Sequence, residues 1–220
     1  MQWSSKWVVV AALAASSVTL SATVDVAAQD EMLRDANGQQ QIWTAVPELV
    51  VLTSVMQYQT AGSRDYVATS EILSATEAQN LVDDLRTALR QLTDNPLADF
   101  AAIHYETVPT GSRAAIVRPK QIVVGRFQGL ADLSRTLGFG GRTARRGEIV
   151  GGAILLDEKF DRTSDRRRLS RTHELGHALG FNHVKSRVSI MNERIGPEVT
   201  PLDRQIGLAA FQRANLRASN

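Results

Sequence analysis

Short apolar runs bounded by turn-forming residues indicate β-strands at four places along the chain. Runs of about four to eight residues that are rich in Val, Ile and aromatic side chains are typical of strands. On this basis the sequence predicts strands at residues 48–53, 100–108, 121–127 and 149–157. The last run contains two adjacent glycines, Gly151 and Gly152, which would allow another backbone to approach closely.

One segment between the first two runs has the spacing of an amphipathic helix. Ser74 and Glu77 form the S-x-x-E pattern of a capping box, in which each side chain bonds the other residue's backbone N–H. Asn95 and Pro96 supply a stop signal. The pattern predicts a helix from Ser74 to about Thr93 that covers the sheet with leucines spaced four apart, namely Leu81, Leu85 and Leu89.

The last third of the chain contains two further helical segments. The first is expected to begin near Thr163 or Ser164 and to end at Gly180. The second follows residues 200–203, which read Thr-Pro-Leu-Asp and provide an N-cap, a proline at the first helical position and an early acid. Strands and helices in this order predict the α+β class.

A glycine-rich stretch at residues 137–142 is expected to be a flexible loop. Its glycine spacing and the lack of a following helix do not fit a phosphate-binding fingerprint.

The candidate chemistry lies in the run from His173 to His183, which reads H-E-x-x-H-x-x-G-x-x-H. Residues four apart share one helical face, so His173 and His177 can direct imidazole nitrogens at one point. Gly180 tolerates the left-handed conformation that ends a helix, and the resulting turn would bring His183 back toward the same point.

These residue types at this spacing indicate a catalytic zinc site. Three protein ligands leave a fourth zinc position open for water, whereas structural zinc sites are closed. Glu174 projects from the same helix and is the motif residue suited to take a proton from that water. A helix face with coincidental histidines is the alternative, but the extended motif makes coincidence a poor explanation.

The extended motif, followed by Met191, resembles the metzincin clan of zinc endopeptidases. The segment 189–192 resembles the clan's Met-turn, although Met191 could also be an ordinary core methionine. The resemblance implies a zincin domain with a twisted, mostly parallel sheet of about four to five strands, a capping helix, an active-site helix and a C-terminal helix. It also implies that His173, His177 and His183 are zinc ligands and that Glu174 is the general base.

The subfamily is not assigned, although the pattern is loosely matrixin-like. Glu193 stands where astacin-like and serralysin-like enzymes have a tyrosine ligand, and the following residues lack the Pro-x-Tyr wall of matrix metalloproteinases. The resemblance implies that the strand before the motif helix is the sheet edge that binds an extended peptide substrate. The expected substrate-edge residues are Gly151, Gly152, Ala153, Ile154 and Leu155.

The amino terminus has the pattern of a secretory signal peptide. Lys6 precedes an apolar stretch at residues 7–20, and small residues for cleavage end at Ala28. We therefore expect a signal peptide at 1–28, a flexible lead-in or short propeptide at 29–45, and a catalytic domain at 46–220. The apolar stretch is too short for a comfortable membrane span, so secreted or periplasmic localisation without stable membrane insertion is expected.

Charge and cysteine content exclude several classes of protein. A formal net charge of +2 is too small to indicate nucleic-acid binding. The chain has no cysteine, so neither a disulfide nor a cysteine switch is available. Two arginine groups are expected to be solvated faces or, alternatively, to favour acidic substrates: Arg142, Arg145 and Arg146, and Arg166, Arg167, Arg168 and Arg171.

A second metal has weaker support. Asp157, Asp161 and Asp165 could hold calcium, but their spacing fits no calcium-loop rule, and helix capping or surface charge explains them more simply. His104 lies in a predicted strand without a partner at metal-ligand spacing, which favours a structural role.

The sequence therefore predicts a monomeric, exported zinc endopeptidase in which zinc-bound water, assisted by Glu174, attacks a peptide carbonyl. Two alternatives remain: a zinc-containing binding module without activity, and a hydrolase of non-peptide amides such as cell-wall linkages.

Overall fold

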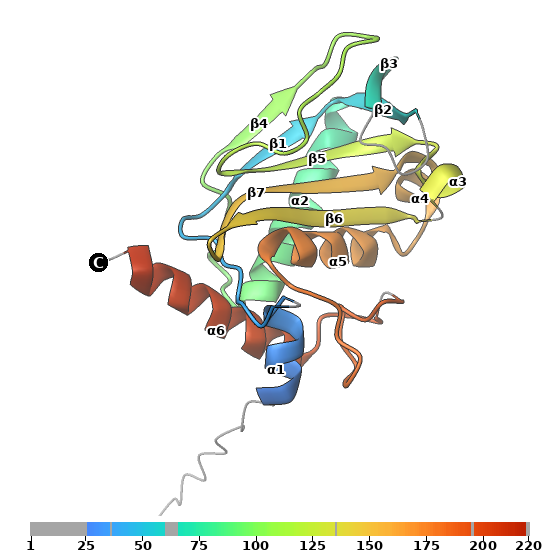
Figure 1. Ribbon diagram of the computed structural model, residues 1–220. Coiled ribbons are helices and arrows are strands. Elements are labelled where there is room, and N and C mark those ends of the chain that lie inside the picture. Colours follow the sequence, from blue (N-terminus) through green and yellow to red (C-terminus); the bar gives the residue numbers. More distant parts are fainter. Residues whose placement is uncertain (1–25, 36, 60–65, 135, 195, 219–220) are drawn as a thin grey trace, which may run out of the picture.

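The computed structural model is an α+β fold in which one curled sheet is packed against long helices (Figure 1). It describes residues 26–35, 37–59, 66–134, 136–194 and 196–218. Most of the predicted signal peptide, residues 1–25, lies outside the described residues, so its cleavage stays a prediction. No helix in the described part of the chain combines the length and the apolarity needed to cross a membrane.

The described residues contain seven strands and six helices. The strands are β1 (Glu48–Leu52), β2 (Ser54–Tyr58), β3 (Tyr66–Ile72), β4 (Ile103–Glu106), β5 (Gln121–Gln128), β6 (Gly138–Arg145) and β7 (Glu148–Asp157). The helices are α1 (Val26–Leu33), α2 (Ala75–Thr93), α3 (Leu130–Ser134), α4 (Glu158–Thr163), α5 (Arg167–Leu179) and α6 (Pro201–Ala218).

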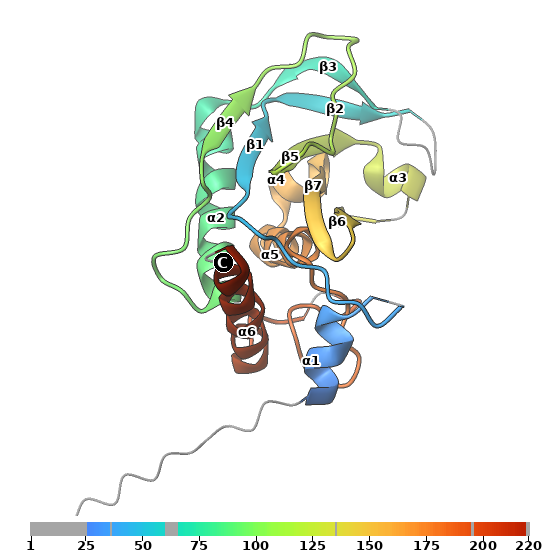
Figure 2. The same cartoon turned by 60° about the vertical axis from the view of Figure 1, so that its left-hand side comes forward.

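Strand β5 is the centre of the sheet. One edge of β5 pairs in parallel with β1 and then with β2, while its other edge pairs in parallel with β7. Strands β4 and β3 lie outside β1 and β2, in parallel and antiparallel pairings respectively. Strand β6 pairs antiparallel with β7 and forms the opposite edge of the sheet (Figure 2).

Alternating strand residues divide the apolar core between the two faces of the sheet. Val51 and Val124 face a large cluster that includes the buried leucines of α2 and Leu175 of α5. Val50 and Val123 face a smaller cluster on the opposite side. This alternation is what a pleated sheet with two covered faces requires. The α2 and α5 helices therefore pack on the same face of the sheet.

The predicted α+β class is confirmed, but the sheet differs from the one expected. It is mixed and has seven strands, whereas a mostly parallel sheet of about four to five strands was predicted. The four predicted strands correspond to β1, β4, β5 and β7, although β4 is shorter than residues 100–108. The sequence interpretation did not include β2, β3 or β6.

The glycine-rich stretch at 137–142 is part of a strand, so the predicted loop is wrong. Residues 138–142 belong to β6, which pairs antiparallel with β7. A Cβ atom on Gly140 would lie 2.1 Å from the backbone oxygen of Glu174. The glycine is therefore required by the close approach of α5 to the strand, since any side chain there would collide with the helix backbone.

The expected substrate-edge strand is also wrong. Residues 151–155 belong to β7, and β7 pairs with β5 on one side and with β6 on the other. Its two adjacent glycines leave room for other parts of the chain to pack closely against β7. A Cβ on Gly151 would lie 2.5 Å from the Arg118 carbonyl oxygen, and one on Gly152 would lie 3.3 Å from the Ala178 side chain.

The described parts of this segment, 29–35 and 37–45, contain residues that pack against the body of the protein, in contrast to the flexible lead-in that the sequence suggested. The α1 helix crosses the predicted cleavage position, and Met32 is fully buried in the larger core cluster. Trp43 is also buried and donates its indole N–H to the Ala178 carbonyl oxygen at 3.0 Å. The alternative of a short propeptide at 29–45 stays a hypothesis.

The capping box at the start of α2 is formed as predicted. Ser74 accepts the Glu77 N–H, and Glu77 accepts the Ser74 N–H. Partial burial acts to raise the pKa of Glu77, but hydrogen bonds from Ser74 and Arg126 outweigh it and lower the pKa to about 2.

We expect Glu77→Gln to destabilise the protein at neutral pH by roughly 1 kcal/mol, because the charge that pairs with Arg126 is lost. Since the folded-state pKa lies below the ordinary glutamate value of 4.5, this contribution is present above about pH 4.5 and is lost as pH falls toward 2. Urea unfolding across this range measures it. The exposed Asp83→Asn on the same helix is the control, and a pH-independent difference would contradict the interpretation.

Candidate metal centre

The α5 helix and the turn that follows it bring three histidines together. His173 and His177 lie one turn apart on α5. Gly180 ends the helix with φ of 115°, and a Cβ there would approach the Gln41 carbonyl oxygen to 2.7 Å. The reversal places the Nε2 atom of His183 3.1 Å from that of His177 and 3.3 Å from that of His173. The three residues can therefore hold a metal ion.

The carbonyl groups around the site orient two of the rings. His173 Nδ1 lies 2.7 Å from the Ile190 carbonyl oxygen, and His177 Nδ1 lies 2.8 Å from that of Phe181. Because a carbonyl oxygen only accepts, each Nδ1 carries the proton and each Nε2 presents its lone pair to the centre of the cluster.

Burial favours the neutral form of all three imidazoles. It lowers the pKa of His173 and His183, and it lowers the pKa of His177 to about 3 together with repulsion from the other two rings. Metal binding requires neutral imidazole, so the folded site presents its ligands in the competent form.

Glu174 lies beside the cluster and is only 6% exposed. Burial raises its pKa to about 7, and the Gly140 N–H bond to its carboxylate partly opposes that shift. A Cβ on Gly138 would approach Glu174 Oε1 to 2.7 Å, so the glycines of β6 leave room for the carboxylate. A carboxyl group with a pKa near neutrality is suited to both accepting and donating a proton.

Met191 lies beneath the motif helix in a tight turn, with its side chain fully buried. The turn closes through an Asn192 N–H bond to the Ser189 carbonyl oxygen at 3.2 Å. A Cβ on Gly176 would lie only 2.4 Å from the Met191 sulfur. Gly176 therefore creates the space that Met191 fills, which explains a glycine in a helix interior, where it is otherwise unfavourable.

A buried acid from α6 stabilises this turn through hydrogen bonds. Asp203 is inaccessible to solvent, accepts the Ile190 N–H at 3.0 Å and bonds the Ser189 hydroxyl. Its carboxylate also accepts the Thr200 N–H at 2.8 Å, which caps α6. Asp203 therefore connects the start of α6 to the turn beneath the histidines. The sequence predicted only an acid in the first turn of a helix at this position.

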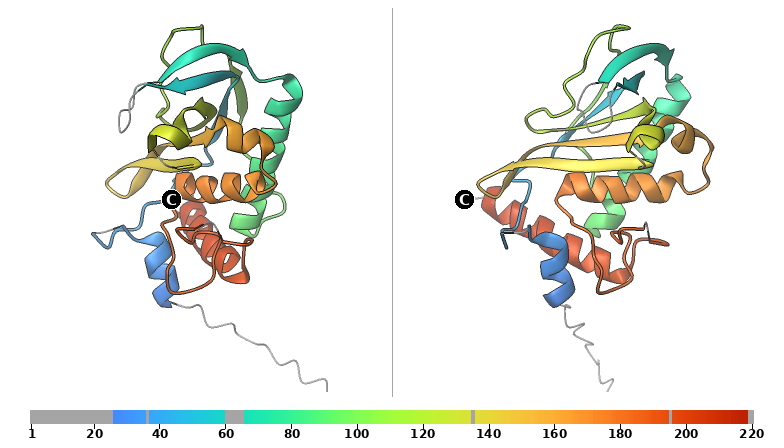
Figure 3. Two further views of the ribbon diagram at one scale, coloured as in Figure 1. Left: turned by 90° about the vertical axis from the view of Figure 1, so that its right-hand side faces the viewer. Right: turned by 45° about the vertical axis from the view of Figure 1, so that its right-hand side comes forward.

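A cavity of about 680 Å³ opens beside the histidines. Its walls come from the start of β6, the residues before α5, and the segment after the methionine turn. Figure 3 shows α5 running along the β6 edge of the sheet. The lining combines apolar and charged side chains, including Phe139, Phe160, Arg166, Glu193 and Arg194. The outer edge of β6, which pairs with no other strand in the described part of the chain, therefore borders the candidate site in place of β7.

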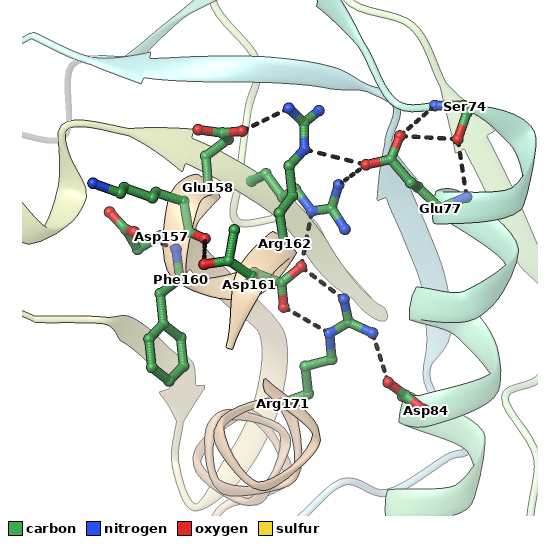
Figure 4. Close-up of polar contacts among 12 residues, drawn as sticks. Ser74, Glu77, Asp84, Asp157, Glu158, Phe160, Asp161, Arg162 and Arg171 are labelled. Atoms are coloured by element: carbon green, nitrogen blue, oxygen red, sulfur yellow. Dashed lines mark hydrogen bonds and ion pairs between the residues drawn. The ribbon is translucent and has the colours of Figure 1, made fainter. Parts of the chain in front are cut away.

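Behind α5 lies a buried network of ion pairs, part of which Figure 4 shows. Asp161 is 2% exposed and accepts from Arg126 Nε at 2.8 Å. It also accepts from Arg171 Nε and Nη2, both at 2.7 Å. Arg171 bonds Asp84 of α2 as well, at 2.6 Å. The network thus connects α2, α4, β5 and α5.

This network changes the interpretation of several sequence candidates. Asp161 bonds two arginines, and Asp157 caps α4 by accepting the Phe160 N–H at 2.9 Å, so calcium is not needed to explain either acid. Arg171 is buried, whereas a solvated face was expected for its group.

Two other candidates lie outside the histidine cluster, and of these only Arg142 departs from its expected role. Arg142 is half-buried and bonds Gln41 Oε1 at 2.7 Å and Asn182 Oδ1 at 2.9 Å. It therefore stabilises the loop that carries His183 and is not part of a solvated face. His104 is half-exposed on β4, where its Nε2 lies 3.3 Å from a Glu48 carboxylate oxygen.

Comparison of the sequence with protein-family models finds no match, and a search of curated proteins finds none either.

Proposed function

We propose that the chain is an exported, zinc-dependent endopeptidase with a metzincin-like fold. The observation that carries this proposal is the convergence of three imidazole Nε2 atoms beside a buried carboxylate, all lining one open cavity. The methionine turn beneath α5 and the parallel core of the sheet with an antiparallel edge strand are further support.

The spacing of the ligand atoms fits zinc. Three nitrogens bound tetrahedrally at about 2.0–2.1 Å from the metal would lie about 3.3–3.4 Å apart. The Nε2 atoms are 3.1, 3.1 and 3.3 Å apart. His173, His177 and His183 would hold the ion, and their position at the cavity wall leaves one side of it accessible. A closed structural site would require a fourth protein ligand.

Glu174 is the proposed proton carrier. Bound zinc supplies Lewis-acid chemistry, which polarises a peptide carbonyl and acidifies water. Glu174 takes the proton of the attacking water and delivers it to the leaving amine nitrogen. The Gly140 N–H holds the carboxylate in place, and burial keeps its proton affinity close to that needed for both transfers.

The proposed substrate is a polypeptide bound in extended form along β6. An unpaired strand edge can add a further strand through main-chain hydrogen bonds. The first residues of β6 line the cavity, so a peptide paired there would pass the histidines. The exposed side chains of Leu137 and Phe139 offer apolar contacts at this edge.

The experiment that tests the proposal is zinc titration combined with proteolysis of a denatured protein. We expect about one zinc per chain and cleavage that stops when a chelator removes the metal. His183→Ala should bind zinc much more weakly, because one of three protein ligands is lost. His104→Ala removes a histidine from β4 and is the matched control.

Retention of full proteolytic activity after verified metal removal would contradict the proposal. Zinc binding without peptide cleavage would instead favour a binding module. Cleavage of cell-wall material alone would favour a hydrolase of non-peptide amides.

A further inference from the structure

The first described residues of the chain bind the loop that carries His183. Glu31 of α1 accepts the Lys185 N–H at 2.6 Å, the Ser186 hydroxyl at 2.6 Å and the Ser186 N–H at 3.3 Å. The Ser186 hydroxyl bond is the main cause of a lowered pKa for Glu31, so its carboxylate is charged at neutral pH. One side chain of α1 therefore binds Lys185 and Ser186, the second and third residues after His183.

Backbone groups of the same segment hold the other side of the loop. The Met32 carbonyl oxygen accepts the Asn182 N–H at 2.7 Å, and the Arg34 carbonyl oxygen accepts the Asn182 side-chain amide at 2.6 Å. The fully buried Met32 side chain anchors this segment in the core. Residues on both sides of His183 are thus fixed by residues 31–34, which we call the amino-terminal clamp.

His183 depends on this support more than the other two histidines do. His173 and His177 belong to α5, and each Nδ1 bonds a carbonyl oxygen. His183 lies outside any helix, and within the described part of the chain its Nδ1 atom has no such bond. The position of its ring is therefore set mainly by the backbone of residues 182–186.

We infer that the amino-terminal clamp positions His183 for metal binding and is retained in the mature protein as part of the catalytic domain. This inference rests on the proposed zinc site. Cleavage after Ala28, as the sequence predicts, would leave all four clamp residues in place. Glu31 acts as a positioning residue through the loop and does not contact the metal. Removing a group that bonds a metal ligand directly typically weakens metal affinity by about 10- to 100-fold, and Glu31, which acts through the loop, is expected at the lower end of that range.

Competitive zinc titration of Glu31→Ala, Ser186→Ala and Asp30→Ala tests the inference. Asp30 neighbours Glu31 on α1, but it is exposed and bonds Arg34 at 2.8 Å, so it is the matched control. We expect Glu31→Ala to weaken zinc binding by about tenfold or more, Ser186→Ala to weaken it less, and Asp30→Ala to leave it unchanged. The Glu31 and Ser186 effects should not add, because the two side chains share one contact.

Two further measurements separate positioning from general destabilisation. The metal-free forms of Glu31→Ala and wild type should unfold at similar urea concentrations, whereas the visible spectrum of the cobalt-substituted variant should differ from that of wild type. Equal zinc affinity in Glu31→Ala and wild type, or an equal loss in Asp30→Ala, would overturn the inference. If Glu31→Ala does not fold, the zinc affinity of Ser186→Ala tests the inference instead. An affinity equal to that of wild type would overturn the inference. Failure of wild type to bind zinc would instead refute the proposed function.

Discussion

Glu174→Gln is expected to slow peptide hydrolysis by about a hundredfold to ten-thousandfold while zinc binding and the fold are retained. Glutamine has a similar volume and can still accept the Gly140 N–H bond, so the packing against β6 should survive. Its amide cannot take a proton from water. The loss should appear in kcat/KM, with zinc content and the unfolding midpoint close to those of wild type.

Glu193→Gln is the matched control for this variant. Glu193 lines the same cavity but is exposed and outside the motif helix, so removal of its charge should have a small effect. Near-normal turnover by zinc-loaded Glu174→Gln would remove Glu174 from the mechanism. A comparable loss in Glu193→Gln would mean that the charge of the cavity, rather than proton transfer, governs the rate.

The local parts of the site could be predicted from the sequence. The α5 helix, the left-handed Gly180 that ends it and the position of His183 depend on residues close together in the chain. The same holds for the capping box of α2, where Ser74 and Glu77 bond each other's backbone. Local spacing of this kind is the strongest signal that one sequence contains.

The sheet edge could not be predicted, because it depends on pairing between distant segments. Glycines are depleted in strands, so the sequence favours a loop at 137–142, whereas the edge role of β7 was only implied by the resemblance to metzincins. The reason for the glycines is the passage of α5 over Gly140, which is a tertiary contact. The hydrophobic pattern of β7 is equally compatible with an internal strand, and this second interpretation is the one that the structure supports.

The supporting residues were missed for the same reason. Nothing in the local sequence distinguishes three of them from ordinary surface or helix-terminal residues: Asp203, Arg142 and Glu31. Their partners lie 13, 40 and 154 residues away along the chain. Gly176 did offer a signal, since an interior glycine costs helix stability of about 1 kcal/mol and calls for a packing explanation. Such residues become recognisable only when the fold brings their partners together.

Asp161→Asn is expected to cause the largest loss of stability among the variants considered, about 3–5 kcal/mol. Asp161 is 2% exposed and is the shared partner of Arg126 and Arg171, both of which are buried. Glu77 and Asp84 would remain as partners of the two arginines, but neither replaces the central carboxylate. Each buried arginine therefore keeps one carboxylate partner but loses the buried one that both share. The loss of that shared partner costs more than the loss of an exposed pair.

Urea unfolding of wild type, Asp161→Asn and Asp165→Asn measures this effect. Asp165 is exposed in the same stretch of chain, so its variant should unfold near the wild-type midpoint. Asp161→Asn should shift the midpoint to lower urea with little change in slope, because the fold itself is kept. A loss below about 1 kcal/mol would show that the buried arginines find other partners or solvent. Because Arg171 lies in the motif helix, a large loss would also show that the buried network stabilises the packing of the helix that carries His173 and His177.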